Sequence, residues 1–266
     1  MILGVGIWYF FFNKKAPSDP EDMAEAVLET IIDEDFDAFM GMTTATLSLS
    51  EWESIAEDYI ERRIEYLEKE LEDAKRDEEE GLENQLETIE IQKENSDTFA
   101  LGMYLRSTLD ELEYDEWEPL AEEFLDGSIK ALKDEIRNAD DDEKEFLEGR
   151  LERLKEEETR KDDYKDWDDA RERRADAWED AFDDVYDNGE EDVDWDEVEF
   201  KKIDYDEDER EAVNDFDIEI HLTYRKDTYI LELDDCIETN LGILMADTPR
   251  WKGEKISSSK SKTSDF

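Results

Sequence analysis

The residue types that most often carry enzymatic chemistry are scarce in this chain. Its 266 residues include one histidine, His221, and one cysteine, Cys236. Apolar and polar residues alternate around His221, which places it on the polar face of a predicted strand, where we expect a surface side chain rather than a general base. No Ser/His/Asp or Cys/His arrangement and no glycine-rich phosphate loop is recognisable around either residue. The sequence therefore assigns no catalytic and no cofactor-binding residue.

The acidic cluster at residues 183–197 can be compared with the calcium-binding loop of an EF-hand. Placing Gly189 at position six of the loop puts Asp184 at position one. Positions three and twelve then fall on Tyr186 and Trp195, although the loop needs oxygen ligands there. Because the pattern fails, we assign no metal ligand. We expect only weak, nonspecific cation binding to so negative a chain.

The charge of the chain restricts its partners. Asp and Glu number 85 against 32 Lys and Arg, which gives a formal net charge of −53. This charge would repel phosphates and attract basic proteins, so we expect no nucleic acid partner. With 38% hydrophobic residues, including 7 Trp, 10 Tyr and 12 Phe, the chain can still bury a core, unlike disordered acidic tails. The single cysteine excludes a disulfide within the chain.

An apolar run at the start of the chain predicts membrane association. Residues 2–12 are uninterrupted apolar residues, with adjacent aromatic side chains, and precede Lys14 and Lys15. The run is shorter than the ~20 residues that span a bilayer, and it lacks the cleavage site of a signal peptide. We interpret residues 1–15 as part of a single membrane anchor, with the side of the membrane left open. A short strand or helical turn inside the core is the alternative.

An internal repeat is the clearest signal in the sequence. "EWESIAEDYIERRIEYLEKEL", from Glu51, aligns without gaps with "EWEPLAEEFLDGSIKALKDEI", from Glu116, at an offset of 65 residues. Shared Glu carries little weight in an acidic chain, but the apolar positions coincide as well. The pairs are Trp52 with Trp117, Ile60 with Leu125, Ile64 with Ile129, Leu67 with Leu132, Leu71 with Ile136, Ala74 with Ala139, Leu82 with Leu147, Leu86 with Leu151, and Ile89 with Leu154.

Each repeat predicts two helices. The first apolar positions step by four and three residues, which is the spacing of a coiled-coil seam. The apolar phase then slips between Asp77 and Glu80, and again between Asp142 and Glu145, pairs with the spacing of a capping box that would begin a new helix. We expect an αα-hairpin in each repeat, with the repeated tryptophans buried at its base. One long helix with a stutter is the alternative.

The pattern changes from helix to sheet along the last third of the chain. Apolar residues at helical spacing predict a third helix over residues 163–186, and residues 187–192 are expected to end the helices. From Trp195 the period is two, and residues 216–224 alternate between an apolar and a polar face. A turn near residues 225–228 and a returning strand follow. These strands predict an antiparallel sheet with one buried face.

The apolar face of this sheet needs a cover, and an amphipathic helix with apolar residues from Met23 to Ile32 can supply it. The predicted fold class is α+β, with N-terminal helices packed on a C-terminal antiparallel sheet and a long, coiled-coil-like helical hairpin insertion. The expected divisions are residues 1–15 for the anchor, 16–50 with 187–256 for the α+β module, 51–186 for the acidic helical region, and 257–266 for a disordered tail.

Segments near the two ends also carry a family resemblance. "PEDMAEAVLETIIDEDFDAFMGMTT", "LSLSEWESIAEDY" and "YILELDDCIETNLGILMADTPRW" resemble the opening helices and last strands of nuclear-transport-factor-2-like, cystatin-like domains, over roughly residues 20–59 and 195–251. The resemblance implies their α+β fold, with the helical repeat as an insertion. Some members use an Asp or Tyr in a pocket as acid or base. Asp217 and Tyr224 are the residues that could be named for that role here, and the resemblance assigns it to neither.

Three functions fit these observations. The first is a non-enzymatic, membrane-tethered protein-interaction module, motivated by the apolar run and the repeat. The second is a soluble acidic chaperone or nucleic-acid mimic that binds basic proteins, motivated by the charge of −53. The third is a small-ligand binder or an enzyme with a pocket between the first helix and the sheet. We favour the first, with an unidentified protein partner for which the charge favours a basic one.

The anchor interpretation predicts that the full chain sediments with membranes and that a chain beginning at Ala16 does not, because only the full chain contains the apolar run. Fractionation of cells that express each form, detected through the same C-terminal epitope, measures this. An identical distribution of the two forms would show that residues 1–15 do not anchor the protein.

Overall fold

The structure is a computed structural model that describes residues 16–74, 79–139, 141–156, 161–210 and 213–254. Within these residues eight α-helices precede an antiparallel sheet of five strands, which confirms the predicted α+β fold class. The helices are α2 (Pro20–Ile32), α3 (Phe36–Met40), α4 (Leu49–Asp73), α5 (Glu79–Lys93), α6 (Ser96–Ser107), α7 (Tyr114–Asn138), α8 (Asp141–Glu156) and α9 (Lys161–Asp192). The strands are β1 (Glu199–Arg210), β2 (Val213–Tyr224), β3 (Asp227–Thr239), β4 (Gly242–Met245) and β5 (Arg250–Glu254). Short 3₁₀ helices, η1 (Thr44–Thr46) and η2 (Trp195–Glu197), precede α4 and β1.

The sheet has the strand order β1-β2-β3-β4, and β5 also pairs with β3. β4 pairs with the C-terminal part of β3, and β5 pairs with its N-terminal part. Residues 225–226 turn the chain between β2 and β3, and Arg225 adopts a left-handed backbone there, with φ of 58°. The predicted alternation is confirmed, because one face of β2 is fully buried at Ile218, Ile220 and Leu222.

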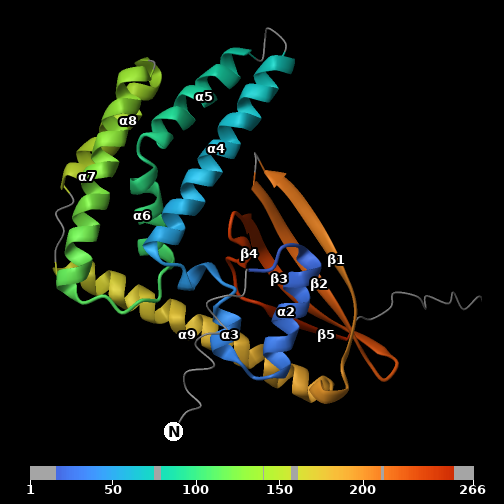
Figure 1. The fold of residues 1–266 in the computed structure, drawn as a ribbon. Coiled ribbons are helices and arrows are strands. Elements are labelled where there is room, and N and C mark those ends of the chain that lie inside the picture. Colours follow the sequence, from blue (N-terminus) through green and yellow to red (C-terminus); the bar gives the residue numbers. More distant parts are fainter. Residues whose placement is uncertain (1–15, 75–78, 140, 157–160, 211–212, 255–266) are drawn as a thin grey trace, which may run out of the picture.

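Helix α2 covers the apolar face of the sheet, as predicted, and Figure 1 shows α2 and α3 lying against it. Asp19 caps the first turn by accepting a hydrogen bond from the backbone N–H of Asp22 at 2.9 Å, and Pro20 suits the first helical position. The apolar side chains of α2 share one core cluster with β2 and β3, and four of them are fully buried: Met23, Ala24, Val27 and Ile31. These packed side chains occupy the space between α2 and the sheet.

The 65-residue repeat forms two helical hairpins. α4 and α7 begin and end at equivalent positions, at Leu49–Asp73 and Tyr114–Asn138. The residues after them have the same extended backbone, with ψ of 149° at Ala74 and 150° at Ala139. α5 packs on α4 and α8 packs on α7, which confirms a hairpin in each repeat and rules out one long helix. In Figure 1 the α4–α5 hairpin lies between the sheet and the α7–α8 hairpin.

Of the two predicted capping boxes, only the one at Asp142 can be tested, and it does not form. Asp142 lies inside α8, which begins at Asp141, so it is not an N-cap. Asp77 lies outside the described residues. The helix after the second slip, α8, therefore begins without the predicted box, and the box after the first slip stays a prediction. Capping boxes occur instead at the starts of α4 and α7, formed by Ser48 with Glu51 and by Glu113 with Glu116.

Helix α9 belongs to two hydrophobic clusters. Its first half packs with α4, α6 and α7 through Tyr164 and Trp167. Its second half packs in the core between α2 and the sheet, through Trp178, Phe182 and Val185. The ring of Phe39, from α3, lies 5.1 Å from Phe182 and 6.1 Å from Trp178, measured between centroids. One continuous helix therefore joins the repeat to the sheet.

The end of α9 differs from the prediction. The helix continues through residues 187–192, which the sequence suggests would end it. Trp195 lies against this last turn and donates from Nε1 to the carbonyl oxygen of Tyr186 at 3.2 Å. Gly189 makes the approach possible, since a Cβ there would lie 2.0 Å from the indole ring. The glycine that resembles a helix terminator is a packing position for a tryptophan.

Side chains of α9 also bind the end of α6 and the segment after it. Four of them donate hydrogen bonds to backbone carbonyls, at 2.8 to 3.4 Å: Tyr164 to Leu112, Trp167 to Leu105, Arg171 to Leu109, and Arg174 to Thr108. Arg171 is buried and also pairs with Asp168 at 3.0 Å. The carbonyl of Leu105 belongs to the last turn of α6, where carbonyls have no partner within the helix, and the other three belong to the segment after it. The four bonds tie this end of α6 and the following segment to α9.

The described chain begins beside β4. The backbone N–H of Ile243 donates to the carbonyl oxygen of Pro17 at 2.7 Å. Gly242 has φ of 127°, and a Cβ there would lie 2.7 Å from the Cβ of Ala16. The predicted anchor, 1–15, and the predicted tail, 257–266, lie outside the described residues. No described helix is long and apolar enough to cross a membrane, so the anchor stays a prediction.

Replacing Ile31 with Asp should destabilise the sheet strongly, because Ile31 is fully buried against it and a carboxylate there has no partner. We expect a loss of at least about 3 kcal/mol in the free energy of unfolding, against about 1 kcal/mol for the control Ile31→Val. Urea unfolding followed by near-ultraviolet circular dichroism measures both. Equal midpoints for the two variants would show that α2 does not close the sheet.

Candidate functional site

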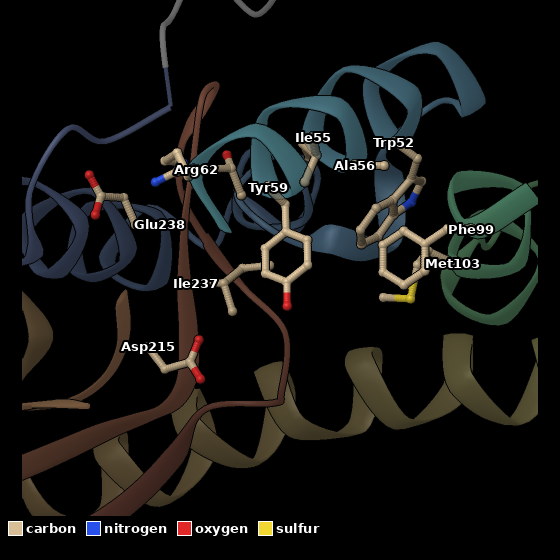
Figure 2. A pocket seen from close by; sticks show the side chains of 11 residues that line it. Trp52, Ile55, Ala56, Tyr59, Arg62, Phe99, Met103, Asp215, Ile237 and Glu238 are labelled. Atoms are coloured by element: carbon tan, nitrogen blue, oxygen red, sulfur yellow. The ribbon is translucent and has the colours of Figure 1, made fainter. Parts of the chain in front are cut away.

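An open groove of about 470 Å³ lies where the first repeat meets the sheet (Figure 2). α4 and α6 supply one side, and the ends of β2 and β3 supply the other. The volume is within the usual range for small-ligand sites, and most of the lining is apolar. The lining residues are Trp52, Ile55, Ala56, Tyr59 and Arg62 of α4, Phe99 and Met103 of α6, and Asp215, Ile237, Glu238 and Thr239 of the sheet.

The helical side of the groove follows from helix periodicity. Trp52, Ile55, Tyr59 and Arg62 recur at steps of three and four residues, so they lie on one face of α4. The ring of Tyr59 stacks on that of Phe99, with centroids 6.3 Å apart. Phe99 is 44% exposed. Burial of this aromatic pair by an apolar group of a ligand would be favourable.

Acidic groups lie on the sheet side of the groove. Asp215 and Glu238 come from the neighbouring strands β2 and β3. Glu238 accepts a hydrogen bond from Nδ2 of Asn214 at 2.8 Å, which orients its carboxylate. Arg62, the basic residue of the lining, pairs within α4 with Asp58 at 2.5 Å. The rim is therefore net negative, and it favours a cationic group next to an apolar one.

The second repeat shows how the equivalent helix face is covered. At the 65-residue offset, Tyr59 corresponds to Phe124, and Arg62 corresponds to Gly127. α6 packs on this face of α7, where a Cβ at Gly102 would lie 2.6 Å from the Phe124 ring. α6 packs on α4 as well, where Tyr59 stacks on Phe99, and α4 also contacts β3. The groove is the part of the α4 face that α6 and the sheet leave uncovered.

The two repeated tryptophans are buried, as predicted, with Trp52 3% and Trp117 5% exposed. Neither indole Nε1 has a hydrogen-bond partner among the described residues. A buried unsatisfied donor costs about 1–3 kcal/mol. Since both repeats share this property, and only Trp52 lines the groove, we attribute it to the packing of the repeat rather than to ligand binding.

His221 is buried, although the sequence predicts an exposed side chain. It lies on the polar face of β2, as predicted, but it is only 1% exposed. β2 runs between β1 and β3, so His221 has a cross-strand neighbour on each side, Lys202 and Ile230. Alternation within β2 indicates which face His221 lies on, but it does not reveal the side chains of β1 and β3 on either side of it. A central strand buries a medium-sized side chain on either face.

Two carboxylates meet the His221 ring. Nε2 of His221 lies 3.0 Å from Oδ2 of Asp204 and 3.4 Å from Oε2 of Glu219. Asp204 is also bound by the ammonium group of Lys202, at 2.5 Å from Oδ2. One donor atom from each of the three residues lies within 4.8 Å of the others, a grouping that can hold a metal ion. Alternation along β2 could have paired Glu219 with His221, but Asp204 joins them only through the register of β1.

Asp217 and Tyr224, the two residues that the family resemblance suggests, do not form a site together. Asp217 is exposed and accepts a hydrogen bond from the backbone N–H of Asp235 at 3.1 Å. Tyr224 is 8% exposed and belongs to the core cluster beneath α2. Neither residue lines the groove, and neither contacts His221 in the hydrogen bonds described. No acid–base pair results from them.

No family model matches this chain, and no curated protein and no solved structure matches it either. The resemblance to nuclear-transport-factor-2-like, cystatin-like domains therefore stays a prediction. The structure itself shows opening helices on a closing antiparallel sheet.

Cys236 should be inert in the folded protein. Burial raises the pKa of its thiol to about 12, and the nearby carboxylates of Asp217, Asp234 and Asp235 act in the same direction. At pH 8 the native thiol is therefore neutral, and a neutral thiol is a poor nucleophile. We expect no reaction with Ellman's reagent at pH 8 in buffer and one equivalent of reaction in guanidinium chloride. Rapid stoichiometric labelling of the native protein would contradict the burial of this strand position.

Proposed function

We propose that this protein is a non-enzymatic protein-interaction module, tethered to a membrane through residues 1–15, which binds a basic amphipathic helix of a partner protein in the groove. The observation that carries the proposal is the pairing of an exposed aromatic stack, Tyr59 with Phe99, with a net negative rim. Such a surface suits a helix that presents an apolar side chain one turn away from a lysine or arginine.

The kind of occupant is suggested by the molecule's own repeat. In the second repeat the equivalent face of α7 is covered by a helix, α6, which approaches closely at Gly102. α6 packs on α4 as well, so a partner helix would lie beside α6 on the open part of the α4 face, next to the ends of β2 and β3. Its face toward Asp215 and Glu238 would carry the basic residues, because opposite charges across an interface select the partner and speed association.

The tether and the groove are compatible in space. Ala16 packs against the same hydrophobic cluster as Trp52, Ile237 and Leu244. A membrane anchor in residues 1–15 would therefore join the folded part beside the groove and hold it near the membrane surface. A soluble acidic chaperone would use the same charge without the tether. The groove favours recognition of one amphipathic segment over the generic attraction of basic proteins.

Selection from a random peptide display library on the full chain tests the groove. We expect enriched peptides that combine apolar residues at helical spacing with Lys or Arg. Their affinity, measured by fluorescence anisotropy, should fall about tenfold or more with Phe99→Ala and with Glu238→Gln, because each removes one central contact.

Matched controls separate the groove from general charge. Phe146→Ala removes another exposed phenylalanine, 64% exposed on α8, and Glu90→Gln removes an exposed carboxylate on α5. Both should leave the affinity unchanged. If the selected peptides are only polybasic, or if the control variants weaken binding as much as the groove variants, nonspecific electrostatic attraction explains the binding and the groove proposal is wrong.

A further inference from the structure

We infer that Asp204, Glu219 and His221 form a binding site for one divalent transition-metal ion of the Zn²⁺ class, on the outer face of β1 and β2. Imidazole and carboxylate ligands together suit Zn²⁺, Mn²⁺, Fe²⁺ and Co²⁺ better than they suit the all-oxygen preference of Ca²⁺. The site is separate from the groove, none of whose lining residues it shares. The inference of a metal site does not depend on the proposed function.

The distances between the donor atoms support an ion of this size. Nε2 of His221 lies 3.0 Å from Asp204 Oδ2 and 3.4 Å from Glu219 Oε2. Bonds of 2.0–2.1 Å in a tetrahedral arrangement place neighbouring ligand atoms about 3.3 Å apart. Both separations from the imidazole nitrogen are therefore near the value that a shared ion requires, and all three donors lie within 4.8 Å of one another. An ion could enter between them with small side-chain rotations.

The backbone holds the three ligands in place before any ion binds. Asp204 is paired directly with Glu219 across β1 and β2, and His221 follows two positions later on the same face. A bulge in β1 between Phe200 and Lys202 adjusts the register beside this site. Ligands on regular strands are positioned more rigidly than ligands on loops, which lowers the ordering cost of binding.

The burial of the three ligands differs in a way that suits a metal site with an open face. The His221 side chain is 2% exposed, while the side chains of Asp204 and Glu219 are 50% and 45% exposed. The imidazole thus forms the floor, and the carboxylates form a rim that reaches solvent. Three protein ligands leave a fourth position of a tetrahedral ion for water or for a donor atom of another molecule.

The neighbouring lysine is compatible with this arrangement. Lys202 binds both oxygens of Asp204, and Oδ2 is the oxygen that faces the imidazole. An ion bound to Oδ2 leaves Oδ1 to Lys202, so the lysine would orient the ligand in the way that outer-shell partners of metal sites commonly do. In the absence of an ion, the same lysine offsets the charge of a carboxylate that lies beside Glu219.

The single histidine of the chain makes a specific test possible. The full chain, produced without a histidine tag and with ¹⁵N-labelled histidine, contributes one imidazole to the nuclear magnetic resonance spectrum. Zn²⁺ is added in a large excess of Mg²⁺, which occupies the general acidic surface. We expect one equivalent of Zn²⁺ to move the Nε2 resonance to that of a metal-bound nitrogen, with the ring proton of the bound imidazole on Nδ1.

Three variants decide between a metal site and an ion pair. Glu219→Gln and Asp204→Asn should weaken Zn²⁺ binding about tenfold or more, as measured by competition with a chromogenic chelator. Glu232→Gln is the matched control, because Glu232 lies opposite Glu219 on β3 and binds Lys252 at 2.5 Å. It removes the same charge and should change the affinity by less than about twofold. An Nε2 resonance that does not respond to Zn²⁺, or equal losses in all three variants, would leave only an ion pair on an acidic surface and overturn the inference.

Discussion

The molecule depends on one helix being shared between two hydrophobic cores. α9 has 32 residues, and its two halves pack against different neighbours, the helical repeat on one side and the sheet on the other. Neither core is complete without it, since each buries aromatic side chains that α9 supplies. Because a helix of this length is stiff, the orientation of the repeat relative to the sheet follows from the helix axis. The groove exists only because that orientation brings α4 near the ends of β2 and β3.

The two repeats share a backbone plan and differ in what covers them. α4 and α7 agree in length and in the geometry of both ends, and both pack on α6, yet α7 also contacts α9, whereas α4 also contacts β3 of the sheet. Repeat proteins commonly protect the exposed face of a terminal unit with a cap. Here the sheet acts as a partial cap, and Phe99 remains exposed where it ends. The two hairpins thus share a fold and differ in the elements that pack against them.

Sequence patterns predicted the structure correctly where the side chains of one segment alone determine its conformation. The amphipathic period of α2, the alternation along β2, and the 65-residue offset each follow from side chains within one segment, and each is confirmed. The failures depend on partners distant in the chain. Gly189 resembles a terminator until Trp195 is placed against it, and His221 resembles a surface residue until β1 and β3 flank it. The groove combines residues from four elements, and the histidine cluster combines residues from two strands. Their assembly requires the register and packing that local periodicity does not contain.

The position at which the described chain begins has a mechanical consequence. Pro17 is hydrogen-bonded to Ile243, and Met42 accepts from Met245, so the four residues of β4 are bound along one edge by segments from the start of the chain. Tension applied through residues preceding Ala16 would reach β4 first and act on these few bonds, before it reached either hairpin. The bond between Pro17 and Ile243 would carry the load first, and α2 follows it along the chain. Such a pull would thus peel the start of the described chain from β4, which stays paired with β3.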